Sequence, residues 1–308
     1  MNDASNSSTR VDTVVDALCN FDTMHHVCIQ RRNEGEPLLS NHSVKRIVRL
    51  ACGLMFPGFY DDTVVSASEL RSRMTIDCNE LRRLLNHQIC AAFCFADTEC
   101  ERSIEGIYRQ ASQAAIDFIE SLPALRAILD TDIEATYLGD PAATSTHEVI
   151  VCYPGIRATM SHRIAHELVK LGVPILPRMI AEQAHSDTGI DIHPDATIGR
   201  SFVIDHGTGV VIGATAIIGD NVKIYQGVTL GARSFVKDAD NNPVKGIARH
   251  PIIGNDVVIY ANSTILGRIN IGDGAVIGGN LWVTAPVGPG ERVVQAVPEN
   301  FKIMPSQN

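Results

Sequence analysis

The feature that most constrains the fold of this chain is a six-residue repeat in its last third. An Ile, Leu or Val recurs every six residues, and in most repeats a small or apolar residue stands two positions earlier. Positions two apart share one face of a strand, so both columns are predicted to point inward. Thirteen positions keep the register, which an ordinary β-sandwich would match only by coincidence. These positions are Ile192, Ile198, Ile204, Ile212, Ile218, Ile224, Leu230, Ile253, Ile259, Ile265, Ile271, Ile277 and Val283.

We interpret this repeat as a parallel β-helix. Three hexads make one coil, so the array predicts about four coils stacked about 4.8 Å apart. Glycine often follows the large apolar residue, as at Gly199 and Gly213. Glycine allows a tight corner that a bulkier residue would strain.

The chain before the repeat has helical periodicity and few strand signals. Apolar residues recur at spacings of three and four over 79–96 and 103–122, and Pro123 is predicted to end the second helix. Another helix is predicted over 159–171. We therefore expect an α+β chain, in which an all-α domain precedes the β-helix. The expected divisions are a disordered tail (1–20), an α-helical domain (21–188), a β-helix (189–290) with an excursion (231–250), and a C-terminal tail (291–308).

The composition indicates a globular protein and argues against two functional classes. Hydrophobic residues make up 45% of the 308 positions and charged residues 20%, as in ordinary folded domains. No apolar run approaches 18 residues, and the net charge of −9 does not suit a general nucleic-acid binder. No secretory signal is recognisable, so we expect a cytoplasmic protein. Its eight cysteines, which lie between Cys19 and Cys152, are expected to be reduced and buried.

The repeat is interrupted twice, and each interruption carries a histidine behind a charged residue. From Ile204 to Ile212 the spacing is eight, and this segment contains Asp205-His206. From Leu230 to Ile253 it is twenty-three, and the excursion ends in Arg249-His250. Extra residues must bulge outward because packing fixes the inner columns. Departures from a regular array are where functional residues are expected.

The excursion over 231–250 is polar and rich in turn-forming residues. It holds four basic and two acidic side chains, a local charge of +2 in a chain of −9. A loop this long is usually functional or disordered. Its positive charge suits an anionic ligand such as a phosphorylated cofactor. The alternative is a solvated loop whose lysines have no function.

His206 is the candidate general base. A neutral imidazole can remove a proton from a hydroxyl near neutral pH, and a carboxylate commonly fixes its tautomer. Asp191, about one coil earlier, is the candidate partner. A lone histidine would more often have a packed structural role, but a histidine at both interruptions favours function.

Other histidines give weaker signals. His162 and His166 have the spacing of metal ligands on a helix, but no third ligand is evident. We expect a structural pair and no metal site. His193 precedes Pro194 in the first coil and is expected to cap a turn. Asp140-Pro141 is typical of a turn.

Taken together, the motifs resemble bacterial serine O-acetyltransferases of the hexapeptide-repeat class. The residues that carry the resemblance are DIHPDA from Asp191, IDHGTGVVIG from Ile204, VTLG from Val228 and RHP from Arg249. The resemblance runs over about 139–297. It implies a left-handed β-helix, homotrimers or dimers of trimers with active sites between neighbouring coils, and acetyl transfer from acetyl-CoA to the hydroxyl of L-serine. That reaction begins cysteine biosynthesis.

The resemblance also implies roles for individual residues. His206 matches the general base and Asp191 its orienting carboxylate. Acetyl-CoA is implied as a co-substrate, with no permanently bound cofactor and no metal. The positions that match serine contacts are Asp140, Asp205, Arg249 and His250, and those expected near acetyl-CoA are Gly231, Ala232 and Ala261.

Three features depart from the family pattern. The excursion is longer than usual and begins Gly231-Ala232 rather than with two glycines, and the region before the repeat is large. The sequence ends in Asn308, whereas members that dock into cysteine synthase end in isoleucine. We therefore do not expect that complex. Feedback inhibition by cysteine is expected from the family alone.

Three other functions are considered. An acetyltransferase of this fold acting on a sugar or other hydroxyl acceptor would lack the serine-contacting set. A metal-dependent hydratase would need three converging histidines, yet only His206 and His250 follow His193. A non-catalytic repeat scaffold would not need a histidine at each interruption.

Overall fold

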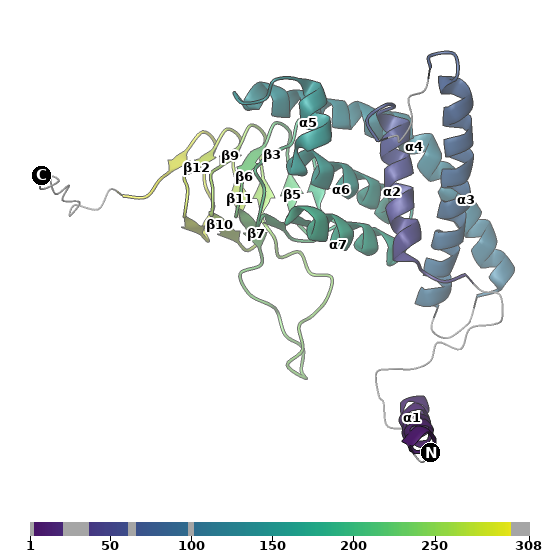
Figure 1. Ribbon diagram of the computed structural model, residues 1–308. Coiled ribbons are helices and arrows are strands. Elements are labelled where there is room, and N and C mark those ends of the chain that lie inside the picture. Colours follow the sequence, from purple (N-terminus) through teal and green to yellow (C-terminus); the bar gives the residue numbers. More distant parts are fainter. Residues whose placement is uncertain (1–2, 21–36, 61–65, 98–101, 297–308) are drawn as a thin grey trace, which may run out of the picture.

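The computed structural model describes residues 3–20, 37–60, 66–97 and 102–296, and shows helices followed by a parallel β-helix (Figure 1). The predicted α+β class is therefore confirmed. The helices are α1 (Asp3–Cys19), α2 (Asn41–Met55), α3 (Leu70–Ala96), α4 (Ile104–Gly139), α5 (Thr146–Cys152), α6 (Pro154–Lys170) and α7 (Leu176–Thr188).

The strands are two or three residues long and form three parallel sheets. The first sheet contains β1 (Asp191–Ile192), β4 (Val211–Ile212), β7 (Thr229–Gly231), β10 (Thr264–Leu266) and β13 (Trp282–Val283). The second contains β2 (Thr197–Ile198), β5 (Ile217–Ile218), β8 (Ile252–Ile253) and β11 (Asn270–Ile271). The third contains β3 (Val203–Asp205), β6 (Lys223–Tyr225), β9 (Val258–Ile259), β12 (Val276–Ile277) and β14 (Arg292–Val293).

The coils follow the six-residue repeat and wind left-handed. In the regular part β10 pairs with β13, so Thr264 lies beside Trp282 one coil later. The predicted inward residues are buried, and Phe202 fills the base of the β-helix core. Sheets of five strands make five coils, one more than predicted. The thirteen repeat positions already supply one strand more than four coils of three, and this extra strand is the fifth of the first sheet. A further strand, β14, lies in the segment expected to be a tail and pairs with β12.

Helix α4 continues through Pro123, where we predicted a helix end. Proline removes one helical hydrogen bond and crowds the preceding turn, at a cost of about 3 kcal/mol. Beyond it, Leu125, Leu129 and Ile133 are buried in the helical core. Burial of such side chains contributes roughly 1.5–3 kcal/mol each, which outweighs that cost.

The structure also has a helix, α1, where we expected a disordered tail. Val11, Val14, Val15 and Leu18 follow the three- and four-residue spacing of one helix face. All four are exposed. The polar composition of this segment concealed its periodicity.

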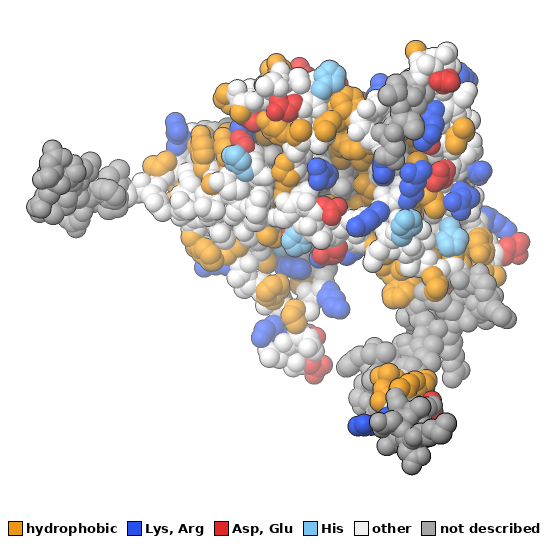
Figure 2. All heavy atoms as spheres, viewed as in Figure 1, with side chains coloured by type: hydrophobic (Ala, Val, Ile, Leu, Met, Phe, Trp, Pro, Cys, Tyr) orange, Lys and Arg blue, Asp and Glu red, His pale blue; other side chains and the backbone are white. Residues whose placement is uncertain are grey.

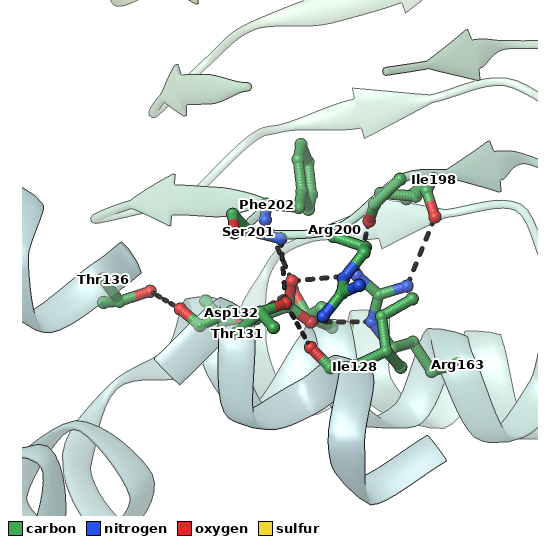
Figure 3. Close-up of polar contacts among 12 residues, drawn as sticks. Ile128, Thr131, Asp132, Thr136, Arg163, Ile198, Arg200, Ser201 and Phe202 are labelled. Atoms are coloured by element: carbon green, nitrogen blue, oxygen red, sulfur yellow. Dashed lines mark hydrogen bonds and ion pairs between the residues drawn. The ribbon is translucent and has the colours of Figure 1, made fainter. Parts of the chain in front are cut away.

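A buried polar cluster joins the helices to the first coil of the β-helix (Figure 3). Asp132 of α4 accepts hydrogen bonds from Arg163 of α6 at 2.7 and 2.9 Å and from the Phe202 amide at 2.9 Å. Arg163 also donates to the carbonyls of Ile198 and Gly199. This cluster fixes the last turns of α4, which lead to Asp140, against the β-helix.

The cysteines only partly match expectation. Cys52 and Cys90 are buried, but Cys19 and Cys152 are exposed. Burial raises the pKa of Cys52 to about 12, so this thiol stays protonated at neutral pH. In the part of the chain that the structure describes, none of the helices has the length and hydropathy needed to cross a bilayer.

Candidate active site

The first interruption presents His206 at a corner of the β-helix. The bulge pairs Asp191 with Val211, twenty positions on, where a regular coil needs eighteen. His206 has φ +58° and Gly207 φ +92°, so the chain turns outward through two left-handed residues. A Cβ at Gly207 would lie 2.5 Å from the Ile190 side chain, and the positive φ would strain any larger residue there. The His206 side chain is consequently 76% exposed.

Four residues gather around His206, and we call the five together the leading cluster: Asp140, Tyr153, Asp205, His206 and Lys223. Asp205 Oδ1 lies 3.8 Å from His206 Nε2, and Asp205 Oδ2 lies 2.9 Å from Lys223 Nζ. The Tyr153 hydroxyl donates to Asp140 Oδ2 at 2.7 Å. That bond lowers the pKa of Asp140, and Lys223 and His206 act in the same direction. The cluster therefore combines two carboxylates and one ammonium with an exposed imidazole.

The second interruption builds a separate group, the trailing cluster: His193, Thr215, Arg249, His250 and Arg268. Thr215 closes the excursion, because its Oγ1 accepts from the Arg249 amide at 2.9 Å and its amide donates to His250 Nδ1 at 3.1 Å. Arg268 donates to the carbonyl of His250 at 3.0 Å. Within the described chain, Arg249 Nε is buried without a hydrogen-bond partner, so a donor remains for a ligand.

His250 is held as a neutral imidazole. Burial lowers its pKa to about 4, and the charges of Arg249 and Arg268 contribute. Because the Thr215 amide donates to Nδ1, the ring proton must lie on Nε2. Gly213 makes room for this ring, since a Cβ there would lie 2.1 Å from it. The side chain is therefore a fixed hydrogen-bond donor.

The two clusters lie at opposite ends of the strands of the first sheet. His206 stands between β3 and β4, where the chain enters that sheet, and Thr215 stands between β4 and β5, where it leaves. Asp191 begins β1 on the outward face between them. No hydrogen bond or ion pair joins Asp191 to His206, both of which the structure describes. The structure thus brings Asp140, Asp205 and His206 together, and Arg249 with His250, but not the two groups.

The positions expected near acetyl-CoA divide in the same way. Gly231 ends β7 beside Leu266, and Ala232 follows it into the excursion. Ala261 lies in the turn before β10, at the end of the strands where the chain enters the first sheet. The excursion projects from the body of the molecule (Figures 1 and 2). It carries exposed Phe235 and Val236, and Arg249 lies over the Phe235 ring at 5.6 Å.

The His162–His166 pair has a structural position. His162 is buried, its ring stacks on His166 at 5.6 Å, and burial lowers its pKa well below the usual value. His166 Nδ1 lies 2.8 Å from the Pro194 carbonyl, as a donor would. Among the described residues, no group of three His, Cys, Asp or Glu side chains is arranged to hold a metal ion.

Sequence reasoning missed Tyr153, Lys223, Thr215 and Arg268. Lys223 reaches the carbonyl of Gly139, 84 positions earlier, so no local spacing indicates the contact. Only the register of β3 with β6, which pairs Asp205 with Tyr225, would have placed Lys223 near Asp205. Thr215 and Arg268 lie at unremarkable positions of the repeat.

Comparison with known proteins gives a consistent result. The family model described as bacterial transferase hexapeptide (six repeats) matches residues 250–285. A serine acetyltransferase, plasmid, from Synechococcus elongatus is 44% identical over 292 residues, which cover 93% of this chain and 91% of the relative. Serine acetyltransferase 1 from Entamoeba histolytica, solved with L-cysteine, superposes with a TM-score of 0.71 at 33% identity, covering 83% of this chain and 87% of that one. A serine acetyltransferase solved with CoA gives a TM-score of 0.52 at 26% identity, covering 74% and 96%.

Proposed function

Because the chain belongs to the serine acetyltransferase family and is an enzyme of that activity, we propose that His206 is its general base. The observation that carries the proposal is the geometry of the first interruption. Two left-handed residues push an exposed imidazole out of the repeat, beside Asp205 and within the anionic leading cluster. A residue that served only packing would not be 76% exposed.

The proposed reaction transfers the acetyl group of acetyl-CoA to the hydroxyl of L-serine. His206 takes the hydroxyl proton while the serine oxygen bonds to the thioester carbonyl carbon. The tetrahedral intermediate then collapses, the carbon–sulfur bond breaks, and the CoA sulfur leaves with the proton held by the imidazolium. O-acetylserine and CoA are the products, and His206 returns to its neutral form. A positioned general base contributes roughly 10²–10⁴-fold.

We propose that the leading and trailing clusters hold opposite ends of serine. The carboxylates of Asp140 and Asp205 suit the ammonium group, and the guanidinium of Arg249 suits the carboxylate. His250 adds a neutral donor through Nε2. Asp191 is proposed to orient the imidazole of His206. The bound CoA of the solved relative supports acetyl-CoA as the second substrate, near Gly231, Ala232 and Ala261.

The separation of the clusters supports a homotrimer in which sites form between subunits. One chain carries the leading and trailing clusters at opposite ends of the strands of the first sheet. A three-fold arrangement would bring the leading cluster of one subunit to the trailing cluster of the next. Pairing of two such trimers through the helices remains part of this proposal.

Replacing His206 tests the assignment. We expect His206→Ala to lower kcat by about 10³-fold with the oligomer intact, because the base is lost. The measurement follows release of free CoA with serine and a panel of other hydroxy amino acids and sugars. His185→Ala, on the exposed part of α7, is the matched control and should retain activity. Unchanged turnover in His206→Ala would reject the general base, and an inert serine with a reactive sugar would reject the substrate.

A further inference from the structure

Lys223 has three partners although it lies on the outside of the β-helix. Its Nζ lies 2.9 Å from Asp205 Oδ2 and donates to the Gly139 carbonyl at 2.8 Å. It also lies 4.8 Å from the centre of the Tyr225 ring, which stacks on Tyr260. The side chains of Lys223 and Asp205 are each only 19% exposed. A surface lysine would ordinarily be more exposed and less constrained.

These contacts join the two segments that supply carboxylates to the leading cluster. Asp205 ends β3, whereas Gly139 ends α4 and immediately precedes Asp140. The two segments are far apart in sequence, and Lys223 on β6 bonds to both. It also divides the oxygens of Asp205, because Oδ2 faces the ammonium and Oδ1 faces His206 at 3.8 Å.

The lysine also sets the charge of the leading cluster. Burial alone lowers the pKa of Lys223, but the neighbouring Asp205 and Tyr225 side chains outweigh burial and raise the pKa, so the lysine is cationic at neutral pH. Two carboxylates and one ammonium carry a net charge of −1. That value balances a single amino group, whereas two unpaired carboxylates would carry −2 and repel each other.

We propose that Lys223 is a positioning residue of the serine site, which holds Asp205 and the Gly139–Asp140 segment at the spacing of one substrate ammonium and cancels one of their two charges. This inference rests on the proposed function, because it assigns the amino-group end of serine to Asp140 and Asp205. Lys223 does not touch the reacting atoms. It acts through the two carboxylates and, by way of Asp205, on the charge around His206.

The test is Lys223→Met, with Lys223→Arg as the conservative variant. We expect Lys223→Met to raise KM for serine roughly tenfold while kcat falls less and KM for acetyl-CoA stays unchanged, since a charge-assisted hydrogen bond that positions one substrate is lost. Lys223→Arg should recover most of the loss. Lys170→Met removes an exposed lysine that pairs with Glu167 on α6, and it should match the wild type.

The pH profile separates positioning from mere support of the fold. Besides His206, the charged or titratable groups of the leading cluster are Asp140, Tyr153, Asp205 and Lys223, and Tyr225 lies beside Lys223. Without the ammonium, the full charge of Asp205 favours the protonated imidazole, which cannot act as a base. The acidic limb of kcat/KM should therefore move up by about half a pH unit at low ionic strength, and Lys223→Arg should move it back.

Each outcome decides one proposal. A Lys223→Met enzyme with wild-type KM and an unshifted acidic limb overturns the inference, provided that His206→Ala is inactive. Equal losses in kcat and in both KM values, with a lowered melting temperature, also overturn it in favour of a structural role. An active His206→Ala enzyme contradicts the proposed base instead, whatever Lys223→Met does.

Discussion

At the scale of single residues, the site depends on side chains whose state is set by one or two neighbours. His206 and His250 have the same side chain and opposite environments. His206 is 76% exposed, whereas His250 is 6% exposed and bonded to Thr215. The first imidazole is therefore accessible from solvent, as the proposed general base must be. The second is fixed as a donor, and this difference makes the pH dependence of stability separable from that of catalysis.

His250 should make the protein less stable in acid. Its pKa is lowered from 6.5 to about 4, so between these values the unfolded chain binds a proton that the folded chain does not. Stability is fully present above about pH 6.5 and is lost as the pH falls through 4. We expect a contribution of about 1–2 kcal/mol, discounted for solvent screening. Thermal unfolding of ligand-free protein at several pH values measures it.

Two variants test whether His250 causes the loss of stability in acid. His250→Gln should reduce the fall in melting temperature between pH 7 and pH 4.5, because the group that titrates is gone. His206→Gln replaces an exposed histidine and should leave the fall unchanged. If the His250→Gln and wild-type curves are parallel, His250 is not the residue responsible.

At the scale of elements, the site depends on how α4 is attached to the β-helix. The pair of Asp132 and Arg163 is buried, and its free hydrogen-bonding groups are used by the backbone of the first coil. Seven residues after Asp132, α4 ends and the chain leads into Asp140. The cluster therefore transmits the position of the β-helix to one side of the proposed serine site.

Breaking this pair should be costly. Asp132→Asn leaves the Arg163 charge buried without its counter-ion, and we expect a loss of about 3 kcal/mol in the free energy of unfolding. Glu80→Gln breaks the exposed pair with Arg46 and should cost less than about 1 kcal/mol. Denaturant unfolding of both variants measures the difference. If both variants lose a similarly small amount of unfolding free energy, the buried pair does not hold the helices to the β-helix.

What the sequence could predict follows from which contacts are local. The inward columns were predictable because each inward repeat residue meets the residue one coil away, as Ile265 meets Val283. The continuation of α4 past Pro123 was not, because it depends on burial of Leu125 and Leu129 by other helices. Lys223 was missed for the same reason, since its partner Gly139 lies in another part of the fold. The sequence motifs predicted His206 and Arg249 as site residues. They did not predict that the two residues lie in separate clusters of one chain.

At the scale of the whole molecule, the most important feature is the separation between the leading and trailing clusters. Both the proposed serine-contacting set and the proposed acetyl-CoA set are divided between the two ends of the strands of the first sheet. Along its outward face, Val211 is 37% and Trp282 72% exposed, so a chain alone leaves apolar surface between the halves. A neighbouring subunit placed against this face would cover that surface and complete the site. The proposed trimer thus explains two observations together.

Mixing two inactive variants tests whether sites form between subunits. His206→Ala destroys the leading cluster and Arg249→Ala the trailing cluster, so each homotrimer should be nearly inactive. After dissociation and random reassembly of equal amounts, about a quarter of the sites pair an intact leading cluster with an intact trailing one, and turnover should recover accordingly. Mixing His206→Ala with Asp140→Ala damages the same half twice and should recover nothing. If mixed trimers, verified by two affinity tags, stay inactive in the first experiment, each chain must complete its own site and the two-subunit proposal fails.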